Sequence, residues 1–323
     1  MNAYRKPSVN GKVRVGVVGV GYLGRIHARI YAAMPEVELV GVADINATAA
    51  REVAAQHGCH AYLAANDLLG KVDAVSIVVP TPAHLETARP FLQGGVHMLM
   101  EKPLAPTYEE SLELVELAER AGIVFQVGHL ERFNAGIMAL AERAVNPRFI
   151  EVHRLGTFVE RATDVDVVTD LMIHDIDIVL SLVKSDIRSI AATGAPVVTE
   201  HVDIANARIE FENGAVANVT ASRVSNKKLR RIRVFGDAHY YGLDYMDQKL
   251  EMAYAAPDAN GGRPRIASET LAIQPRPPLD TELACFIQSV RTGAPPLVNG
   301  RVGLEALRVA LLVKERIAAC TTQ

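Results

Sequence analysis

One short stretch of this 323-residue sequence places two opposite charges directly after an apolar run. Residues 96–100 (VHMLM) are followed by Glu101, Lys102 and Pro103. A residue before proline is restricted to extended conformations, so the Lys102 side chain should project forward from a strand end. An ammonium group in a partly dry cleft beside another cation binds its proton less tightly and can relay it near neutral pH. A solvated ion pair at a strand end is the alternative, and this stretch alone favours neither.

A second stretch, TDLMIHDIDIVLSLV, places polar residues on an otherwise apolar helix. Asp170, His174 and Asp177 are spaced by four and three residues, which puts them on one helix face. His174 can accept a proton from a hydroxyl while a hydride leaves the same carbon, and Asp170 can orient it or bind a neighbouring hydroxyl. The alternatives are a core histidine held by its neighbours and a metal site. No further Cys or His cluster completes a metal site, so we expect no metal.

A glycine-rich turn follows the first apolar strand and opens a helix. In Gly19-Val-Gly21-Tyr-Leu-Gly24, the glycines would permit a tight turn, close approach of a pyrophosphate, and helix–strand packing. Asp44 ends the second strand, where a carboxylate can accept hydrogen bonds from both ribose hydroxyls and would repel a 2′-phosphate. This predicts NAD rather than NADP. The cofactor contacts expected here are Gly19, Gly21, Tyr22, Leu23, Gly24 and Asp44.

Three further cofactor candidates follow the third strand at its carboxyl end, where open sheets bind ligands. They are Pro80, Thr81 and His84. Thr81 could equally be a cap for a helix that starts near Ala83, and His84 could be a surface residue of its first turn.

Apolar runs and amphipathic stretches alternate regularly in the first part of the chain. The runs are continuous and β-branched, as is typical of strands buried on both faces of a parallel sheet. Strand–helix alternation predicts right-handed crossovers and a doubly wound α/β sheet, a Rossmann fold. We expect strands at 13–19, 37–43, 73–79, 96–100 and 123–127, and helices at 22–34, 46–58, 83–94 and 107–122.

The pattern changes after about residue 128. Asn213-Gly214 separates two alternating runs and is a strong β-hairpin signal. The second part is therefore predicted to be an α+β domain with an open, mostly antiparallel sheet. We expect a polar tail at 1–11, an NAD-binding domain at 12–128 and a substrate-binding and oligomerisation domain at 129–323. The expected elements are helices at 133–145, 168–184, 279–292 and 301–320, and strands at 148–157 and within 202–225, 229–236 and 239–245.

The composition excludes several classes of function. The net charge is −3 and Lys and Arg are scattered, which argues against a nucleic-acid partner. The polar start lacks the apolar core of a signal peptide, and no run approaches membrane-spanning length. The three cysteines, Cys59, Cys285 and Cys320, are odd in number and far apart, as suits a reducing cytoplasm. We therefore expect a cytoplasmic protein without a membrane partner.

Taken together, the glycine turn, Glu101-Lys102-Pro103 and the Asp170-x3-His174 helix resemble the Gfo/Idh/MocA family of NAD(P)-dependent sugar dehydrogenases, over about residues 12–320. The resemblance implies that Lys102 and His174 act in proton transfer or substrate binding. It also implies that Asp170 contacts substrate hydroxyls and that Glu101 lies near the nicotinamide riboside. Met172 departs from the glycine that many relatives carry in that helix. In QVGHLERFN, the segment matched at the domain junction, the candidate substrate-binding residues are His129, Arg132 and Asn134.

The resemblance extends locally to a bacterial subgroup that oxidises the 3-hydroxyl of UDP-N-acetylglucosamine for lipid A biosynthesis. Five basic residues could carry positive charge for its diphosphate. An inositol or other sugar dehydrogenase of the same family is the alternative, and a non-catalytic NAD-binding sensor is a remote one. An open sheet with a face or edge to cover predicts a homodimer or homotetramer. The five basic residues are Arg154, Arg161, Arg223, Lys227 and Lys228.

Overall fold

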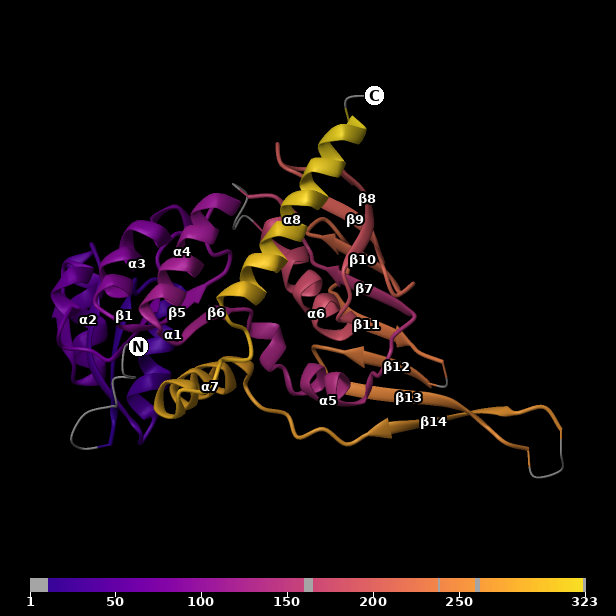
Figure 1. Cartoon of the computed structure of the whole chain (residues 1–323), viewed down its shortest axis with the longest axis horizontal. Coiled ribbons are helices and arrows are strands. Elements are labelled where there is room, and N and C mark those ends of the chain that lie inside the picture. Colours follow the sequence, from indigo (N-terminus) through magenta and orange to yellow (C-terminus); the bar gives the residue numbers. More distant parts are fainter. Residues whose placement is uncertain (1–10, 160–164, 238, 259–261, 322–323) are drawn as a thin grey trace. The chain divides into compact units, whose positions relative to one another are not determined.

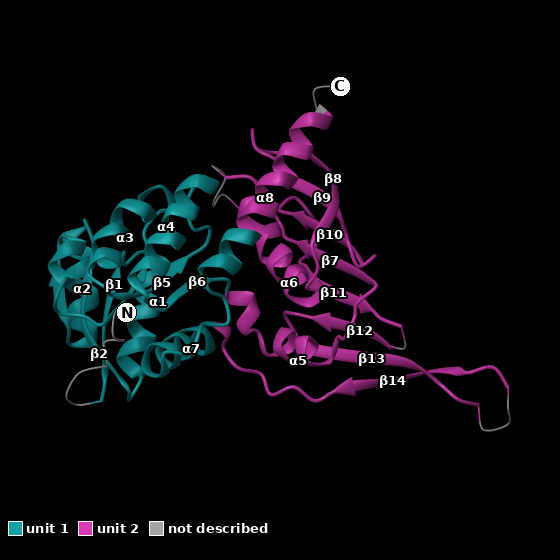
Figure 2. Ribbon diagram, viewed as in Figure 1, with its two compact units in different colours: residues 1–129, 279–305 teal, residues 130–278, 306–323 magenta. Residues whose placement is uncertain are grey.

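The chain folds into two compact units, each with its own sheet (Figure 2). The computed structural model describes residues 11–159, 165–237, 239–258 and 262–321 (Figure 1). Unit 1 comprises residues 1–129 and 279–305, and unit 2 comprises residues 130–278 and 306–323. The first division lies one residue from the expected boundary, but 279–305 returns to unit 1 instead of staying with the second domain. The expected polar tail lies outside the described residues apart from Gly11.

Residues 279–305 return to unit 1 because their apolar side chains complete its core. Leu283, Phe286 and Ile287 are fully buried in one hydrophobic cluster with the strand residues Val15 and Val17. From its position in the chain, this segment is predicted to belong to the second domain. Its buried side chains show that it packs in the core of unit 1.

Unit 1 contains a six-stranded parallel sheet in the order β3-β2-β1-β4-β5-β6. The side chains of β1 and β4 are almost all buried, as strands covered on both faces require. The order reverses between β1 and β4, so the carboxyl ends of these strands flank the position where such sheets bind ligands. The strands are β1 (Val13–Val18), β2 (Val37–Ala43), β3 (His60–Tyr62), β4 (Ala74–Ile77), β5 (His97–Glu101) and β6 (Phe125–Gly128).

The helices of unit 1 begin and end where the sequence signals place them. In α4 the Thr107 side chain accepts a hydrogen bond from the Glu110 amide, and Gly122 ends the helix with φ of 64°. The helices are α1 (Tyr22–Ala33), α2 (Ala47–His57), α3 (His84–Gln93), α4 (Tyr108–Ala121) and α7 (Pro278–Thr292), with 3₁₀ turns η1 (Ala65–Leu68) and η2 (Thr81–Ala83).

Unit 2 contains an eight-stranded sheet in the order β14-β13-β12-β11-β7-β10-β9-β8. Every neighbouring pair is antiparallel except β7 and β10. Gly214, with φ of 83°, closes the predicted hairpin between β9 and β10. The strands are β7 (Phe149–Leu155), β8 (Ile187–Ala195), β9 (Ile204–Phe211), β10 (Val216–Ser222), β11 (Leu229–Phe235), β12 (His239–Asp244), β13 (Lys249–Ala256) and β14 (Arg265–Leu271).

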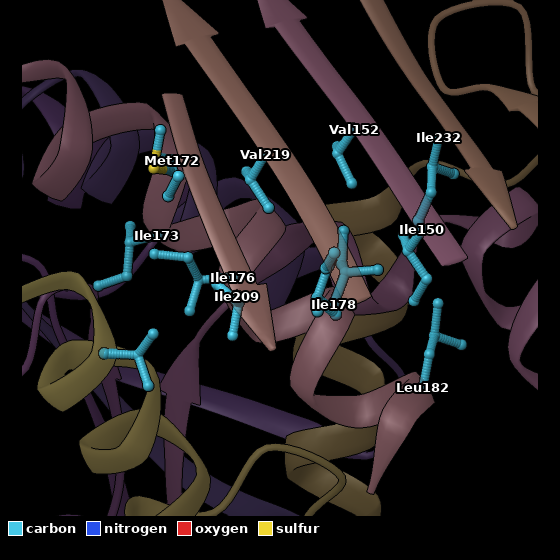
Figure 3. Packing of buried hydrophobic residues seen from close by; sticks show 14 of the residues in the cluster. Ile150, Val152, Met172, Ile173, Ile176, Ile178, Leu182, Ile209, Val219 and Ile232 are labelled. Atoms are coloured by element: carbon cyan, nitrogen blue, oxygen red, sulfur yellow. The ribbon is translucent and has the colours of Figure 1, made fainter. Parts of the chain in front are cut away.

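One face of this sheet packs against helices and forms the core of unit 2. Burial alternates along β9 and β10, so Ile209 and Val219 point toward Ile176 of α6 while their neighbours face outward (Figure 3). The other sheet face bears a mixed polar surface. The remaining elements are η3 (Leu130–Phe133), α5 (Ala135–Arg143), a π-helical segment η4 (Val168–Met172), α6 (Ile173–Val183) and α8 (Gly300–Thr321), of which residues 306–321 lie in unit 2.

No helix among the residues that the structure describes combines the length and the apolar character needed to cross a membrane.

Candidate active site

A pocket of about 790 Å³ lies at the carboxyl ends of β1, β2, β4 and β5 in unit 1. It occupies the position where the strand order reverses, as expected for a dinucleotide. The candidates Tyr22, Gly24, Thr81 and His84 are not among its lining residues. The cofactor candidates that line it are Gly19, Gly21, Leu23, Asp44, Pro80, Glu101 and Lys102.

The glycine turn forms a backbone cradle that side chains would fill. Gly19 has φ of +86°, and an added Cβ would lie 2.6 Å from the Val78 carbonyl oxygen. A Cβ on Gly24 would lie 1.8 Å from the Gly19 carbonyl oxygen, whereas one on Gly21 would meet nothing within 4 Å. Gly19 and Gly24 are therefore required by the protein's own packing. Gly21 leaves open space beside the start of α1, which fits the approach of a pyrophosphate to free helix amides.

Asp44 is held in place by backbone donors. The Val20 amide donates to Oδ2 at 2.7 Å, and the Asn46 amide donates to Oδ1 at 2.8 Å. Each carboxylate oxygen can accept further hydrogen bonds, so an anchored Asp44 fits a ribose diol at the rim of the pocket. The residues present therefore fit an NAD molecule.

The other cofactor candidates lie elsewhere. Tyr22 is 70% exposed, and Thr81 begins η2 with no side-chain cap bond found for this turn. The cap residue of α3 is Ala83, so Thr81 is not the helix cap considered from the sequence. His84 is 1% exposed and is therefore not the surface residue considered. Its Nδ1 lies 3.1 Å from the Leu104 carbonyl oxygen and its Nε2 lies 3.0 Å from that of Val79.

The Glu101 carboxylate at the end of β5 is packed from two sides. His27 Nε2 of α1 lies 3.4 Å from Oε1, and a Cβ on Gly128 would lie 2.9 Å from Oε2. The Glu101 side chain is 14% exposed and shares the pocket lining with Lys102. His27 carries no sequence signal that predicts this contact, whereas Gly128 belongs to the segment QVGHLERFN.

In unit 2, Asp170 and His174 lie on two different kinds of helix. Asp170 belongs to the π-helical segment η4, and His174 belongs to the first turn of α6. The expected single α-helix over 168–184 is thus wrong at its start, because a π segment carries no recognisable sequence signal. Such segments often occur at functional sites. Met172, at the position of departure from the family pattern, is fully buried.

Asp166 lies two residues before the π segment and binds its first amides. Its Oδ1 accepts hydrogen bonds from the Val168 and Thr169 amides at 3.0 and 2.9 Å, and Lys314 Nζ lies 2.8 Å from Oδ2. Burial tends to raise the pKa of Asp166, but the hydrogen bonds from Lys314 and Thr169 outweigh it and lower that pKa. An ionised Asp166 therefore anchors the turn that carries Asp170.

The three substrate-binding candidates predicted from QVGHLERFN make different contacts in the structure. Arg132 donates to Asp177 Oδ1 at 3.2 Å, so Asp177 is committed to an ion pair within unit 2. Asn134 caps α5 by accepting a hydrogen bond from the Gly136 amide at 2.9 Å. His129, in unit 1, is 1% exposed.

The three catalytic candidates are divided between the two units. Lys102 belongs to unit 1, whereas Asp170 and His174 belong to unit 2, so their meeting in one cleft stays a prediction.

Two of the proposed diphosphate-binding arginines are committed to buried ion pairs, which corrects that expectation. Arg154 is 4% exposed and donates to both Asp175 oxygens at 2.7 and 2.8 Å and to Glu131 at 2.8 Å. Arg223 Nε lies 2.9 Å from Asp203, which is fully buried. Burial tends to lower the pKa of Arg154, but Asp175 outweighs it and raises that pKa. Lys227 and Lys228 are exposed, and Arg161 lies outside the described residues.

Within the described ranges, no group of three or more His, Cys, Asp or Glu side chains is placed to hold a metal ion.

Known proteins match both parts of the chain. Residues 13–129 match the GFO/IDH/MocA oxidoreductase family, NAD-binding Rossmann fold, and residues 142–241 match the GFO/IDH/MocA C-terminal domain. A UDP-N-acetylglucosamine 3-dehydrogenase of Acidithiobacillus ferrooxidans is 37% identical over 308 residues, which span 95% of this chain and 98% of that protein. Its solved structure matches with a TM-score of 0.89 and the same coverage.

Two more distant proteins are also similar over nearly the whole chain. A myo-inositol 2-dehydrogenase of Thermotoga maritima is 26% identical, with 94% of this chain and 96% of that protein covered. A levoglucosan dehydrogenase solved in complex with NADH shares the fold, with a TM-score of 0.83 at 20% identity and coverage of 95% and 97%.

Proposed function

Because the chain belongs to the GFO/IDH/MocA oxidoreductase family, we propose that it oxidises the 3-hydroxyl of UDP-N-acetylglucosamine with NAD as the hydride acceptor, giving a 3-keto sugar. The observation that carries the choice of substrate is the 37% identity, over 95% of this chain, to a dehydrogenase of that name. An inositol or other sugar dehydrogenase is the second candidate, favoured by the 26% identity to a myo-inositol 2-dehydrogenase.

In this proposal the pocket of unit 1 would hold NAD, which would supply a hydride acceptor to the reaction. Gly19, Gly21 and Asp44 bind it, and Asp44 selects NAD over NADP because its carboxylate would repel a 2′-phosphate. Glu101 lies beside the riboside. The anchoring of Asp44 by two amides supports this role, because a fixed carboxylate cannot turn away from a phosphate at low cost.

The protein's own groups handle the hydroxyl proton. The single proton of the hydroxyl passes to Lys102 or to His174 as the electron pair of the carbon–hydrogen bond leaves as hydride, and Asp170 binds a neighbouring sugar hydroxyl. His129, Arg132 and Asn134 line the substrate side. The position of the half-buried Lys102 in the lining of the cofactor pocket supports its part in this step.

The experiment that tests the substrate measures NADH absorbance with UDP-N-acetylglucosamine, myo-inositol and glucose in parallel. We expect the nucleotide sugar to give the highest kcat/KM. A higher value for myo-inositol would favour the second candidate instead. Lys102→Ala should lower kcat by about 10²- to 10⁴-fold while NAD binding, measured by calorimetry, stays close to wild type. Turnover that survives this substitution would contradict the assignment of Lys102.

We further propose that the protein works in the cytoplasm, in lipid A biosynthesis, as a homodimer or homotetramer, with no nucleic-acid or membrane partner. A net charge of −3 and the spread of basic residues support the absence of a nucleic-acid partner. The polar outer face of the unit 2 sheet supports self-association, since a broad open sheet face is commonly covered by another subunit.

A further inference from the structure

Two buried histidines contact the segment Glu101–Leu104 on either side of Lys102. His27, on α1, is 0% exposed and places Nε2 3.4 Å from Glu101 Oε1. His84, on α3, is 1% exposed and places Nδ1 3.1 Å from the carbonyl oxygen of Leu104. The two contacts thus bracket Lys102, one through the residue before it and one through the residue two positions after it.

Burial of the polar His27 side chain destabilises the folded protein. Among the described residues, neither of its ring nitrogens has a hydrogen-bond partner that meets ordinary geometry, and Glu101 is the ionic group that Nε2 faces. Burying a polar side chain without full hydrogen bonding costs free energy, so an apolar residue would stabilise α1 more. A buried polar group of this kind calls for a functional reason.

The Glu101 carboxylate has little freedom to move away from His27. A Cβ on Gly128 would come within 2.9 Å of Glu101 Oε2 and 3.1 Å of Glu101 Cα, so the carboxylate packs directly against the backbone of β6. Because Glu101 pairs with Gly128 in the parallel ladder, this contact is set by the register of the sheet. His27 on one side and Gly128 on the other therefore fix the carboxylate next to Lys102.

His84 joins two strand ends of the cofactor pocket. Its Nε2 lies 3.0 Å from the carbonyl oxygen of Val79, which precedes Pro80 in the pocket lining. Burial lowers the pKa of His84 more than its bonds to the Leu104 and Val79 carbonyls raise it, so the ring is neutral at pH 7. A neutral imidazole carries one N–H, so it donates to one of these two carbonyl oxygens at a time.

We propose that His27 and His84 are positioning residues for proton transfer: they hold Glu101 and Leu104 so that Lys102 is presented to the substrate in one pose. This inference rests on the proposed function, in which Lys102 handles the hydroxyl proton. Neither histidine lines the pocket, so neither is expected to touch NAD or the sugar. Their effect should appear in kcat, with little change in cofactor affinity.

A crossed pair of substitutions at each histidine tests this proposal. The amide nitrogen of Gln lies near the place of Nε2, and that of Asn lies near the place of Nδ1. At position 27 the Glu101 contact uses Nε2, so His27→Gln should stay within a few-fold of the wild-type kcat while His27→Asn loses about 100-fold. At position 84 the Leu104 contact uses Nδ1, so His84→Asn should retain activity and His84→Gln should lose it.

Tyr31→Phe is the matched control. Tyr31 is a fully buried residue of α1 one turn beyond His27, and its hydroxyl bonds Ser76 Oγ at 2.8 Å. This substitution should lower thermal stability without changing kcat per folded site. Rates are measured on the sugar that the wild type oxidises best, with the folded fraction taken from circular dichroism and the NAD Kd from calorimetry. Equal effects of Gln and Asn at both positions, or rates that simply follow stability, would overturn the proposal.

A second readout does not depend on turnover. The rate at which an acylating reagent modifies Lys102, followed by mass spectrometry, reports how the side chain is presented. We expect His27→Asn and His84→Gln to change this rate several-fold relative to exposed lysines, and Tyr31→Phe to leave it unchanged. If the wild type oxidises no sugar, the proposed function fails, whereas an unchanged Lys102 labelling rate in all four histidine variants would refute the positioning role itself.

Discussion

The proposed preference for NAD over NADP rests on one residue, Asp44. Its two oxygens are each fixed by a backbone amide, so the negative charge stays at the rim of the pocket whatever binds there. A 2′-phosphate brought to this place would meet a charge of its own sign, and no arginine stands among the described residues that line the pocket. The proposed selectivity therefore depends on the charge of the side chain and not only on its size.

Asp44→Asn removes this charge and preserves the size of the side chain. We expect kcat/KM for NAD to fall by about 10- to 100-fold, because a hydrogen bond to a charged group contributes about 1.5–3 kcal/mol. The kcat/KM for NADP should fall less, so the ratio of kcat/KM for NAD to kcat/KM for NADP decreases. Steady-state kinetics with both cofactors measures this, and Glu38→Gln, an exposed acid on the same strand, is the control. An unchanged ratio would contradict the role of Asp44.

Glu282 is a second acid with unusual surroundings, buried in unit 1. It is 0% exposed, and among the described residues neither carboxyl oxygen has a hydrogen-bond partner. Burial, and then the negative charge of Glu101, raise the pKa of Glu282 well above its usual range. The folded protein therefore keeps a proton here that the unfolded chain releases above pH of about 4.3.

It follows that Glu282 makes the folded state less stable as pH rises. The loss proceeds by up to about 1.4 kcal/mol per pH unit from about pH 4.3 to the pKa of the folded state. Gln does not titrate. The unfolding free energy of Glu282→Gln, measured with urea, should therefore increase relative to that of the wild type as the pH rises through this range. Glu119→Gln is a control whose pH effect lies below about pH 4.3 and has the opposite sign, because hydrogen bonding to Arg301 lowers the pKa of Glu119. A difference in unfolding free energy between Glu282→Gln and the wild type that stays constant with pH would contradict the prediction.

At the scale of elements, a buried ion pair holds the helix that carries His174. Arg154 of β7 donates two hydrogen bonds to Asp175, the residue directly after His174. Removing one partner of a buried pair leaves an uncompensated charge, which is strongly destabilising. The pair therefore fixes α6 against the sheet beside His174, the residue proposed to act on the substrate.

Arg154→Met should lower the unfolding free energy by about 3–5 kcal/mol. The double variant Arg154→Met with Asp175→Leu should recover most of this loss, because it also removes the fully buried carboxylate, while Glu131 keeps Arg230 at 3.4 Å. Arg301→Met breaks an exposed pair with Glu119 and should change stability little. Chemical denaturation of the four proteins measures these differences, and a double variant as unstable as the single one would show that the charge is not the cause.

The regular elements were predictable where local patterns decide them. Buried β-branched runs identified the parallel sheet, and Thr107 and Gly122 marked the ends of α4. The strand β3 was missed because its three residues are exposed or half-buried, and β8 because it contains no fully buried residue. The π segment has no pattern of its own. Its geometry depends on the tertiary structure around Asp166.

The same division holds for the candidate site. The glycine turn was predictable because its requirements lie within a few residues, whereas Arg154 and Asp175 are 21 positions apart and no local signal joins them. A signal for Arg154 did exist: in FIEVHRL it shares the inward face of β7 with Ile150 and Val152. An arginine on a buried face requires an acid, and that reasoning would have excluded it as a diphosphate ligand.

At the scale of the molecule, the outer face of the unit 2 sheet predicts an oligomer. Asn206 and Thr220 lie on this face and are joined by a hydrogen bond of 2.9 Å. Light scattering should give a mass of two or four times the 34.9 kDa of one chain. Thr220→Arg should shift the mass toward the monomer by adding a bulky charge, while Ser185→Arg, outside the sheet, should not. A monomer in the wild type would contradict the prediction.

The return of the chain to unit 1 has a consequence for the order of synthesis. The core that surrounds the nucleotide-binding strands includes Leu283 and Phe286, and the Gln126 side chain donates to the Glu282 carbonyl at 3.2 Å. These partners leave the ribosome only after all of residues 130–278. The first domain to be translated therefore waits, with part of its apolar surface open, until the second has nearly been made.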